Sequence, residues 1–167
     1  MGWVLLAVIL WAAAFLAIPQ RDFRRLVPFG VVAGFGLALL VNILGSSIFG
    51  LWGFRGAVWP ILGVPFWAVL AWVPVAVAFV YFLPDGSLPR LGWLLLFPAV
   101  FTAVDFIFLR AGLFFFSPDW NLAYSFLLSV GLHILILSYY LTSVRGPAAR
   151  SDAAGLRLGR AEPEEED

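Results

Sequence analysis

The sequence predicts an all-α membrane protein, a polytopic helix bundle of about five spans, from three observations. Of its 167 residues, 63% are hydrophobic and 12% are charged, whereas a soluble domain has about 45–50% apolar and about 25% charged residues. The apolar residues form long runs, and about 20 in a row suffice for a helix to cross a ~30 Å hydrocarbon layer. The arginines fall mainly in alternate segments between these runs, the pattern that orients a multi-pass protein.

Five apolar runs define the expected spans, which are residues 2–18, 26–49, 65–83, 91–109 and 122–141. The first run has no basic residue before it, as a signal peptide would require, so we expect a retained span. Pro28 falls in the first turn of the second span, where a missing N–H costs little. Pro74 lies at the centre of the third span and should kink it, which membranes tolerate when neighbours satisfy the freed carbonyl.

Two segments and a tail lie outside these spans. Residues 53–64 are rich in Gly and Pro around Trp59-Pro60. Residues 110–121 contain the aromatic residues Phe114, Phe115, Phe116 and Trp120. We expect both segments to be loops at the membrane interface, where aromatic side chains suit the headgroup region. Residues 142–167 are rich in Ala, Gly, Arg and Glu with few large apolar side chains, so we expect a disordered tail.

The distribution of arginine predicts the N-terminus outside and the C-terminus inside. In this orientation the inside segments hold eight of the ten arginines, namely Arg21, Arg24, Arg25, Arg90, Arg145, Arg150, Arg157 and Arg160. The outside segments hold Arg55 and Arg110. Cytoplasmic loops are enriched in Lys and Arg. We therefore expect a multi-pass protein of the cytoplasmic membrane with its tail inside the cell.

Composition excludes several kinds of site. The chain has no cysteine, which excludes disulfides, thiolate catalysis and cysteine-ligated metals. His133 is its one histidine, so a multi-histidine metal site or a bis-histidine haem within one chain is excluded. The sequence has no basic stripe of the kind that binds nucleic acid. We expect no metal, no cofactor and no nucleic-acid partner.

Two stripes of small or polar residues occur at four-residue spacing, which keeps side chains on one helix face. In the second span the stripe is Gly30, Gly34, Ala38, Asn42, Ser46 and Gly50. In the fifth span it is Asn121, Ser125, Ser129 and His133. Small residues let membrane helices approach closely, and Ser, Asn and His hydrogen-bond across the contact. The stripes match in depth, which favours a packing seam between the two spans; the alternative is that the seam lines a ligand or proton path.

Asp105 is the strongest functional candidate, because a carboxylate within a span costs about 2.5–3.5 kcal/mol at mid-membrane and such acids face the bundle interior or a watered cavity. It lies in the fourth span, about one turn below Arg110. One interpretation is structural: Asp105 hydrogen-bonds to Ser46, Tyr124 or Ser125, or reaches toward Arg110. The other is a proton, cation or ligand site.

His133 lies near the middle of the fifth span, between Leu132 and Ile134. A lone histidine there is most simply a neutral residue hydrogen-bonded to Ser129, one turn back. An axial ligand to a haem or chlorophyll-type pigment is an alternative. A proton relay with Asp105 is another, although the two side chains differ in depth by roughly 9 Å at 1.5 Å per residue.

Several short motifs resemble a family of small five-span membrane proteins from Gram-positive spore-forming bacteria, a family without an established activity. They are Pro19 with Arg24 and Arg25 after the first span, Phe-Leu-Pro at residues 82–84, and Trp120-Asn121 with Ser125 one turn on. The resemblance covers residues 1 to about 141. It implies the same bacterial five-span architecture and leaves the function open.

The function expected from these observations is non-catalytic: a scaffold or accessory subunit of a membrane assembly. Its expected partners are membrane lipids and either other membrane subunits or further copies of the chain. The alternative is a small transporter or ligand-binding membrane protein with an outer-half pocket around Asp105, Asn42 and Ser125. A membrane enzyme comes third, because Ser129 and His133 on one helix are a poor substitute for a facing serine–histidine pair.

Overall fold

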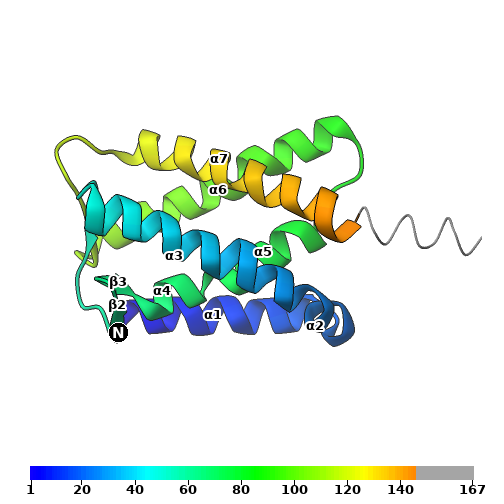
Figure 1. The fold of residues 1–167 in the computed structure, drawn as a ribbon, viewed down its shortest axis with the longest axis horizontal. Coiled ribbons are helices and arrows are strands. Elements are labelled where there is room, and N and C mark those ends of the chain that lie inside the picture. The colour runs from blue at the N-terminus through cyan, green and yellow to red at the C-terminus, as the bar shows by residue number, and fades with distance from the viewer. Residues whose placement is uncertain (146–167) are drawn as a thin grey trace, which may run out of the picture.

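The computed structural model describes residues 1–145, which are mostly helical. Figure 1 shows the helices lying along one long axis, with successive segments running in opposite directions. In chain order the segments are α1 (Gly2–Ala17); α2 (Gln20–Phe29), η1 (Gly30–Gly36), α3 (Leu37–Asn42) and η2 (Ile43–Ile48), which form one continuous helix; α4 (Phe66–Leu70) and α5 (Trp72–Tyr81); α6 (Ser87–Arg110); and α7 (Leu122–Tyr139) with η3 (Tyr140–Arg145). The segments η1, η2 and η3 are π-helical. The all-α class is confirmed.

Within residues 1–145, three helices are long and apolar enough to cross a membrane: Gln20–Ile48, Ser87–Arg110 and Leu122–Val144. The helices Gly2–Ala17 and Phe66–Tyr81 are apolar but shorter. Sixteen residues rise about 24 Å, against a hydrocarbon layer of about 30 Å. All five segments fall on the apolar runs of the sequence, whereas five crossings and their orientation stay predictions.

The second helix begins six residues earlier than predicted, at Gln20 instead of residue 26, directly after Pro19. Gln and Arg are good helix formers, and Asp22 in the first turn complements the helix dipole. Phe23 and Leu26 are buried along this stretch, so the segment is an amphipathic helix. The sequence prediction places the start of the span where an uncharged run begins. It therefore leaves out this segment, which contains arginines.

The C-terminal helix also continues past the predicted end of the bundle. The sequence predicts the tail from Thr142, but η3 extends the helix to Arg145. The Thr142 hydroxyl donates to the Ser138 backbone oxygen at 2.9 Å, which ties this residue to the preceding turn. The rest of the predicted tail, residues 146–167, lies outside the described residues.

Pro74 breaks the third segment as predicted, with α4 ending at Leu70 and α5 beginning at Trp72. Proline has no N–H, so the carbonyl four residues earlier, that of Leu70, loses its helical donor. The Trp11 indole Nε1 donates to this oxygen at 3.2 Å. A neighbouring helix thus satisfies the freed carbonyl, the condition on which such a kink is tolerated in a membrane.

The core centres on α5, whose buried residues are Val73, Pro74, Val75, Ala76, Val77, Phe79 and Val80. A Cβ added to Gly30 would lie 2.9 Å from the Val73 backbone oxygen, and one added to Gly34 would meet the backbone oxygen of Trp72. The small-residue stripe of the second span therefore packs mainly against the third. The prediction that the fifth span covers this stripe is wrong at Gly30 and Gly34, where the third span does so. Residue spacing defines a helix face, but it does not say which helix covers that face.

The two predicted interfacial loops contain strands that pair with each other. β1 (Trp52–Phe54) and β4 (Phe114–Phe116) are antiparallel, with Gly53 opposite Phe115. A second hairpin joins β2 (Pro60–Ile61) to β3 (Val64–Pro65). Phe115 is exposed, but Phe114 is buried against Trp3 and Phe54. The expectation that all the aromatic residues of residues 110–121 face the headgroups is therefore wrong for Phe114.

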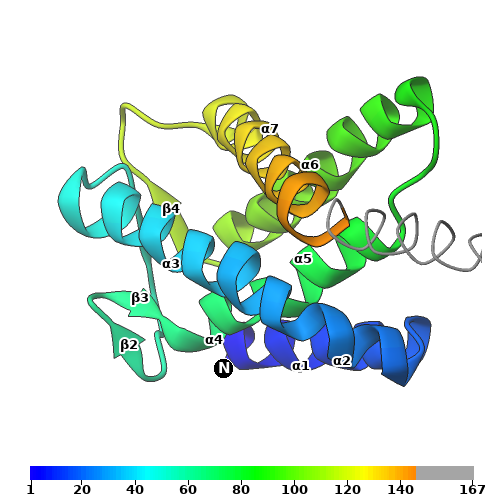
Figure 2. The same ribbon diagram turned by 45° about the vertical axis from the view of Figure 1, so that its right-hand side comes forward.

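Helices α6 and α7 cross as a pair beside the other helices, as Figures 1 and 2 show. At the end of the molecule where α2 begins, one apolar cluster joins them to the rest, with Ile136 and Leu137 of α7 packed in the same core as Phe23 and Phe79. At the opposite end a second cluster contains Trp3, Trp52 and Phe114. The space between these two clusters holds the candidate site.

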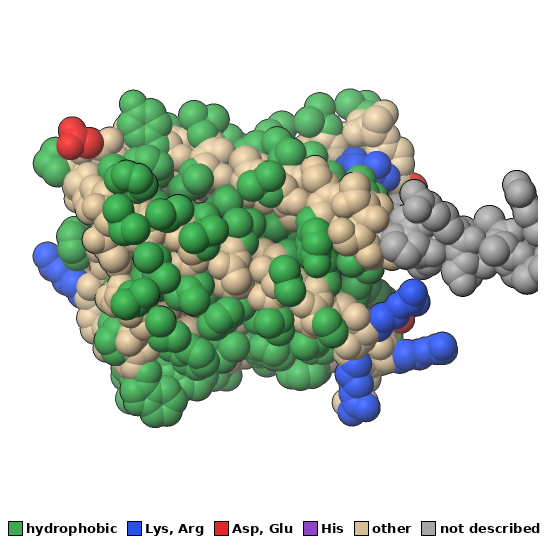
Figure 3. Space-filling model, viewed as in Figure 1, with side chains coloured by type: hydrophobic (Ala, Val, Ile, Leu, Met, Phe, Trp, Pro, Cys, Tyr) green, Lys and Arg blue, Asp and Glu red, His purple; other side chains and the backbone are tan. Residues whose placement is uncertain are grey.

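The surface has an apolar middle and charged ends. Figure 3 shows hydrophobic side chains across the middle of the visible face, with Lys or Arg side chains at the ends and gathered where α2 begins. Large apolar side chains that are exposed include Leu5, Ile9, Val32, Leu96, Val100 and Leu135. A soluble domain rarely exposes such a continuous apolar surface, so the surface suits a lipid environment.

Candidate functional site: a cavity around Asp105

A cavity of about 140 Å³ lies between the α6–α7 pair and the remaining helices. All of the long helical segments contribute to its wall, and Trp52, Phe54 and Phe114 of the β1–β4 sheet line it at the N-terminal end of the molecule. Its polar lining side chains include Asp105, Asn42, Ser125 and Ser129. The cavity therefore combines a carboxylate with hydroxyl and amide groups inside an apolar bundle.

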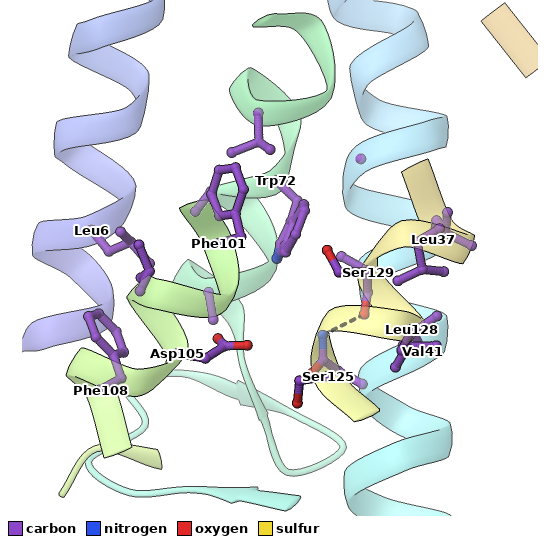
Figure 4. Close-up of a pocket in the computed structure, with 18 of the residues that line it drawn as sticks. Leu6, Leu37, Val41, Trp72, Phe101, Asp105, Phe108, Ser125, Leu128 and Ser129 are labelled. Carbon is purple, nitrogen blue, oxygen red and sulfur yellow. Dashed lines mark hydrogen bonds between the residues drawn. The ribbon is translucent and has the colours of Figure 1, made fainter. Parts of the chain in front are cut away.

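Asp105 lies in the last two turns of α6, on the face that lines the cavity. Figure 4 shows its carboxylate directed across the cavity toward α7, where Ser125 and Ser129 lie. Phe101 and Phe108, four residues before and three after it, line the same cavity, as the helical repeat requires. The apolar sequence of α6 thus presents one carboxylate between two phenyl rings.

The Asp105 carboxylate makes no hydrogen bond or ion pair with the described protein residues. The expected bonds to Ser46, Tyr124 or Ser125 are not formed. Arg110, the other expected partner, is exposed with its guanidinium 5.2 Å from the centre of the Phe106 ring. The hydrogen bonds by which Asp105 would lock the bundle are therefore absent among residues 1–145.

Two of the cavity's other polar groups already have partners. The Asn42 side-chain oxygen accepts from Trp52 Nε1 at 3.1 Å, and its Nδ2 donates to the Ala38 backbone oxygen at 2.8 Å. The Ser125 hydroxyl accepts from Trp120 Nε1 at 2.9 Å. The donors of these bonds, Trp52 and Trp120, lie at the end of the molecule that holds β1 and β4, and they fix the orientation of both side chains. The bonds also leave fewer oxygen atoms free to bind a ligand.

Aromatic rings form much of the cavity wall and are held in place by one another. Trp3 and Phe108 have ring centres 4.7 Å apart in an edge-on arrangement, and Trp72 and Phe101 lie 5.1 Å apart. Trp3 Nε1 donates to the Arg55 backbone oxygen at 3.2 Å, so its polar edge is satisfied away from Asp105. The walls are therefore rigid and present ring surface to the cavity.

Small residues create the space that these rings surround. Gly34 and Ala38 line the cavity together with Ala33, Ala68 and Ala71. Gly30 lies outside it, packed against Val73 and Val77. The small-residue stripe thus has two uses: its first members bring η1 against α5, and the following ones leave room beside α6 and α7.

Of the residues named from the sequence as possible ligand or proton contacts, Ser46, Asn121 and His133 lie outside the cavity lining. Asn121 caps α7, its side-chain oxygen accepting from the Tyr124 backbone N–H at 3.1 Å. The predicted matching of the stripes in depth does not bring Ser46 to Asp105. The tryptophans that wall the cavity were missed, because their abundance in the sequence does not say which of them share a space.

His133 is 1% exposed and lies behind the cavity. Its Nδ1 is 2.7 Å from the Ser129 backbone oxygen and 3.5 Å from the Ser129 hydroxyl. The rings of Phe79 and Phe97 lie 4.8 and 5.6 Å from its own, and Nε2 is buried without a partner in the described chain. This tight aromatic packing agrees with the neutral, structural interpretation and leaves no room at Nε2 for a pigment.

No known protein family, curated protein or solved structure matches this chain.

Proposed function

We propose that this chain is a non-catalytic multi-pass membrane protein that binds a small ligand in the cavity around Asp105. All five helical segments cross the membrane in this proposal, with the N-terminus outside. The cavity then lies in the outer half, near the end that carries Arg55 and Arg110, and the end where α2 begins faces the cytoplasm. The clustering of arginine at that end supports the orientation.

One observation carries the proposal: a carboxylate with no hydrogen-bond or ion-pair partner among residues 1–145 points into a cavity with mostly apolar walls. An ionisable group within a membrane bundle is costly, and such groups mark ligand, ion or proton paths. A polar group that lacks a partner inside an apolar bundle calls for an explanation, and a bound ligand is one. The carboxylate of Asp105 is directed at space that a ligand can fill.

The described geometry does not support an enzyme at this site. The serine nearest to His133 is Ser129, and Nδ1 lies closer to its backbone oxygen, 2.7 Å, than to its hydroxyl, 3.5 Å. Nδ1 donates to that oxygen, and Nε2, the nitrogen left to act as a general base, has no hydroxyl within hydrogen-bond distance among the described residues. Binding or transport is the chemistry that fits the cavity.

A second candidate function, an accessory subunit, is favoured by the surface of α6. In this 24-residue helix the one buried residue is Pro98. Such a helix has an apolar surface available to lipid or to another membrane helix. Association with a partner subunit is compatible with ligand binding, since the cavity lies on the other side of α6.

The proposal predicts that filling the cavity abolishes binding. Ser129→Leu places a larger apolar side chain in the cavity, so small amphipathic probes that raise the thermal denaturation temperature of the purified wild-type protein should no longer do so. Ser138→Leu makes the same change at an exposed position of the same helix and should leave the probe response intact. If no probe stabilises the wild type, or if both variants respond like it, the cavity is not a binding site.

A further inference from the structure

We propose that the ligand is a small organic cation, an alkylammonium ion held by the Asp105 carboxylate and the phenyl rings beside it. This inference rests on the proposed binding function and names its ligand class. Four properties of the cavity support this inference: the charge that Asp105 can carry, the aromatic rings of the wall, the small number of free oxygen atoms in the lining, and the volume.

The cavity has one group that can carry a charge, and no lining residue offers it an opposite charge. Asp105 is the one ionisable residue among the lining side chains. Arg110 and Arg55, the arginines at this end of the molecule, lie over other rings: Arg110 is over the Phe106 ring and Arg55 is over the Phe115 ring at 5.3 Å. A carboxyl group removed from water either takes up a proton or pairs with an opposite charge. A ligand that brings one positive charge pairs with the ionised form.

The walls next to the carboxylate suit an organic cation. Phe101 and Phe108 lie on the same helix as Asp105, and Figure 4 shows the Phe101 ring above its carboxylate and the Phe108 ring to its left. Aromatic faces attract cations, most strongly in desolvated sites, and they recognise quaternary ammonium groups. A methylated or alkylated ammonium also buries its carbon atoms against the same rings, which an inorganic ion does not.

The cavity offers too few oxygen atoms for an inorganic cation. A calcium ion takes about six to eight oxygen ligands. Here the side-chain oxygens of Asn42 and Ser125 already accept from Trp52 and Trp120, and Asp105 supplies the one carboxylate. Within residues 1–145 no group of three His, Cys, Asp or Glu side chains is placed to hold a metal ion. An alkylammonium ion needs only the carboxylate and the rings.

The volume of the cavity suits a ligand group of a few heavy atoms. The cavity measures about 140 Å³, close to the ~150 Å³ cavity that binds benzene in an engineered protein. Drug-sized ligands occupy about 300–1,000 Å³. Tetramethylammonium and similarly small amines have the size that the cavity accepts.

The test compares probes that share a shape and differ in charge. Full-length protein in an uncharged, non-ionic detergent is titrated with tetramethylammonium chloride, with neutral tert-butanol and with sodium chloride, at constant ionic strength. The fluorescence of Trp3, Trp52 and Trp72, which line the cavity, reports binding, and thermal stabilisation confirms it. We expect tetramethylammonium to bind more tightly than tert-butanol by about tenfold or more, because only the cation is attracted by the carboxylate charge and by the faces of the aromatic rings, and we expect sodium not to compete.

Two carboxylate variants link the charge preference to Asp105. Asp105→Asn keeps the shape of the side chain and removes its charge, so it should weaken tetramethylammonium binding by about tenfold or more and leave tert-butanol binding unchanged. That neutral binding also shows that the variant is folded. Asp119→Asn removes an exposed carboxylate from the loop before α7 and should change neither.

The outcomes separate this inference from the function on which it rests. If tert-butanol binds as tightly as tetramethylammonium, or if sodium displaces the latter, the ligand class is wrong and the cavity remains a binding site. If Asp105→Asn leaves tetramethylammonium binding unchanged, the carboxylate is not the cation site. If none of the probes binds to the wild type, the proposed function fails as well.

Discussion

At the scale of single residues, tryptophan connects elements that are distant in the sequence. Indole N–H groups donate from Trp3 to the Arg55 oxygen, from Trp11 to the Leu70 oxygen, from Trp93 to the Phe79 oxygen, from Trp52 to the Asn42 side chain and from Trp120 to the Ser125 hydroxyl. Without water to hydrogen-bond them, exposed carbonyls in a bilayer need protein donors. Tryptophan supplies one donor on a large apolar ring, so it satisfies a carbonyl while it also packs.

The Trp11 bond gives a residue-scale prediction. Trp11→Phe keeps an aromatic ring but leaves the Leu70 oxygen beside Pro74 without its donor, which should lower the free energy of unfolding by about 1–3 kcal/mol. The measurement is denaturation in detergent, followed by the loss of helical circular dichroism. Trp59→Phe at a residue that is 69% exposed is the matched control. Equal stability of the two variants would mean that the Leu70 carbonyl needs no partner.

At the scale of elements, the helix Gln20–Ile48 departs from regular α-helix in two segments, of which η1 borders the cavity. It is π-helical over η1 and again over η2. π-helical turns are rare and occur frequently at functional sites. Pro28 precedes η1, and Gly30, Gly34 and Gly36 lie within it, residues with low helix propensity. Wider turns and missing side chains let this helix both press against α5 and border the cavity.

The contact between η1 and α5 gives an element-scale prediction. Gly34→Leu would drive a side chain into the Trp72 backbone, and overpacking costs about 1–3 kcal/mol or more. We expect a lower thermal denaturation temperature and a smaller yield of folded protein. Gly36 lies in the same segment, and a Cβ there would meet the Val31 oxygen at an ordinary 3.6 Å, so Gly36→Ala should be tolerated. Normal folding of Gly34→Leu would show that α5 can move away from η1.

At the scale of the whole molecule, charge and hydropathy divide the protein into two ends and a middle. Arginines are concentrated at the end where α2 begins, and apolar side chains cover the middle (Figure 3). The N-terminus lies at the opposite end, next to the β2–β3 hairpin (Figure 1). If the apolar middle lies in the bilayer, the two ends lie on opposite sides of it, and the arginine-rich end belongs in the cytoplasm.

This division predicts the outcome of a topology experiment. A reporter that is active only in the cytoplasm should work when it is fused after Arg145 and fail when it is fused at Arg55. A reporter active only outside should give the reverse pattern and serves as the control. Cytoplasmic activity at Arg55 would overturn both the orientation and the outer-half position of the cavity.

Part of the fold and part of the site could be predicted from local sequence. The start of α7 at Leu122 was predicted correctly, because an apolar run begins there and Asn121 is a good N-cap. The Pro74 break was predicted because a missing N–H acts locally. Asp105, Asn42, Ser125 and Ser129 were named from polarity within apolar runs, and they line one cavity.

What the sequence by itself determined is therefore the set of apolar helices, their approximate ends and the few polar side chains inside them. Local forces decide these features: hydrophobic burial, helix capping and the missing donor of proline. Which helix covers the small-residue stripe, the pairing of β1 with β4 and the enclosure of His133 by Phe79 and Phe97 were decided by the tertiary structure alone. The reason is physical: an apolar helix face packs almost equally well against any other of complementary shape, so its partner depends on how the whole set of helices fills space.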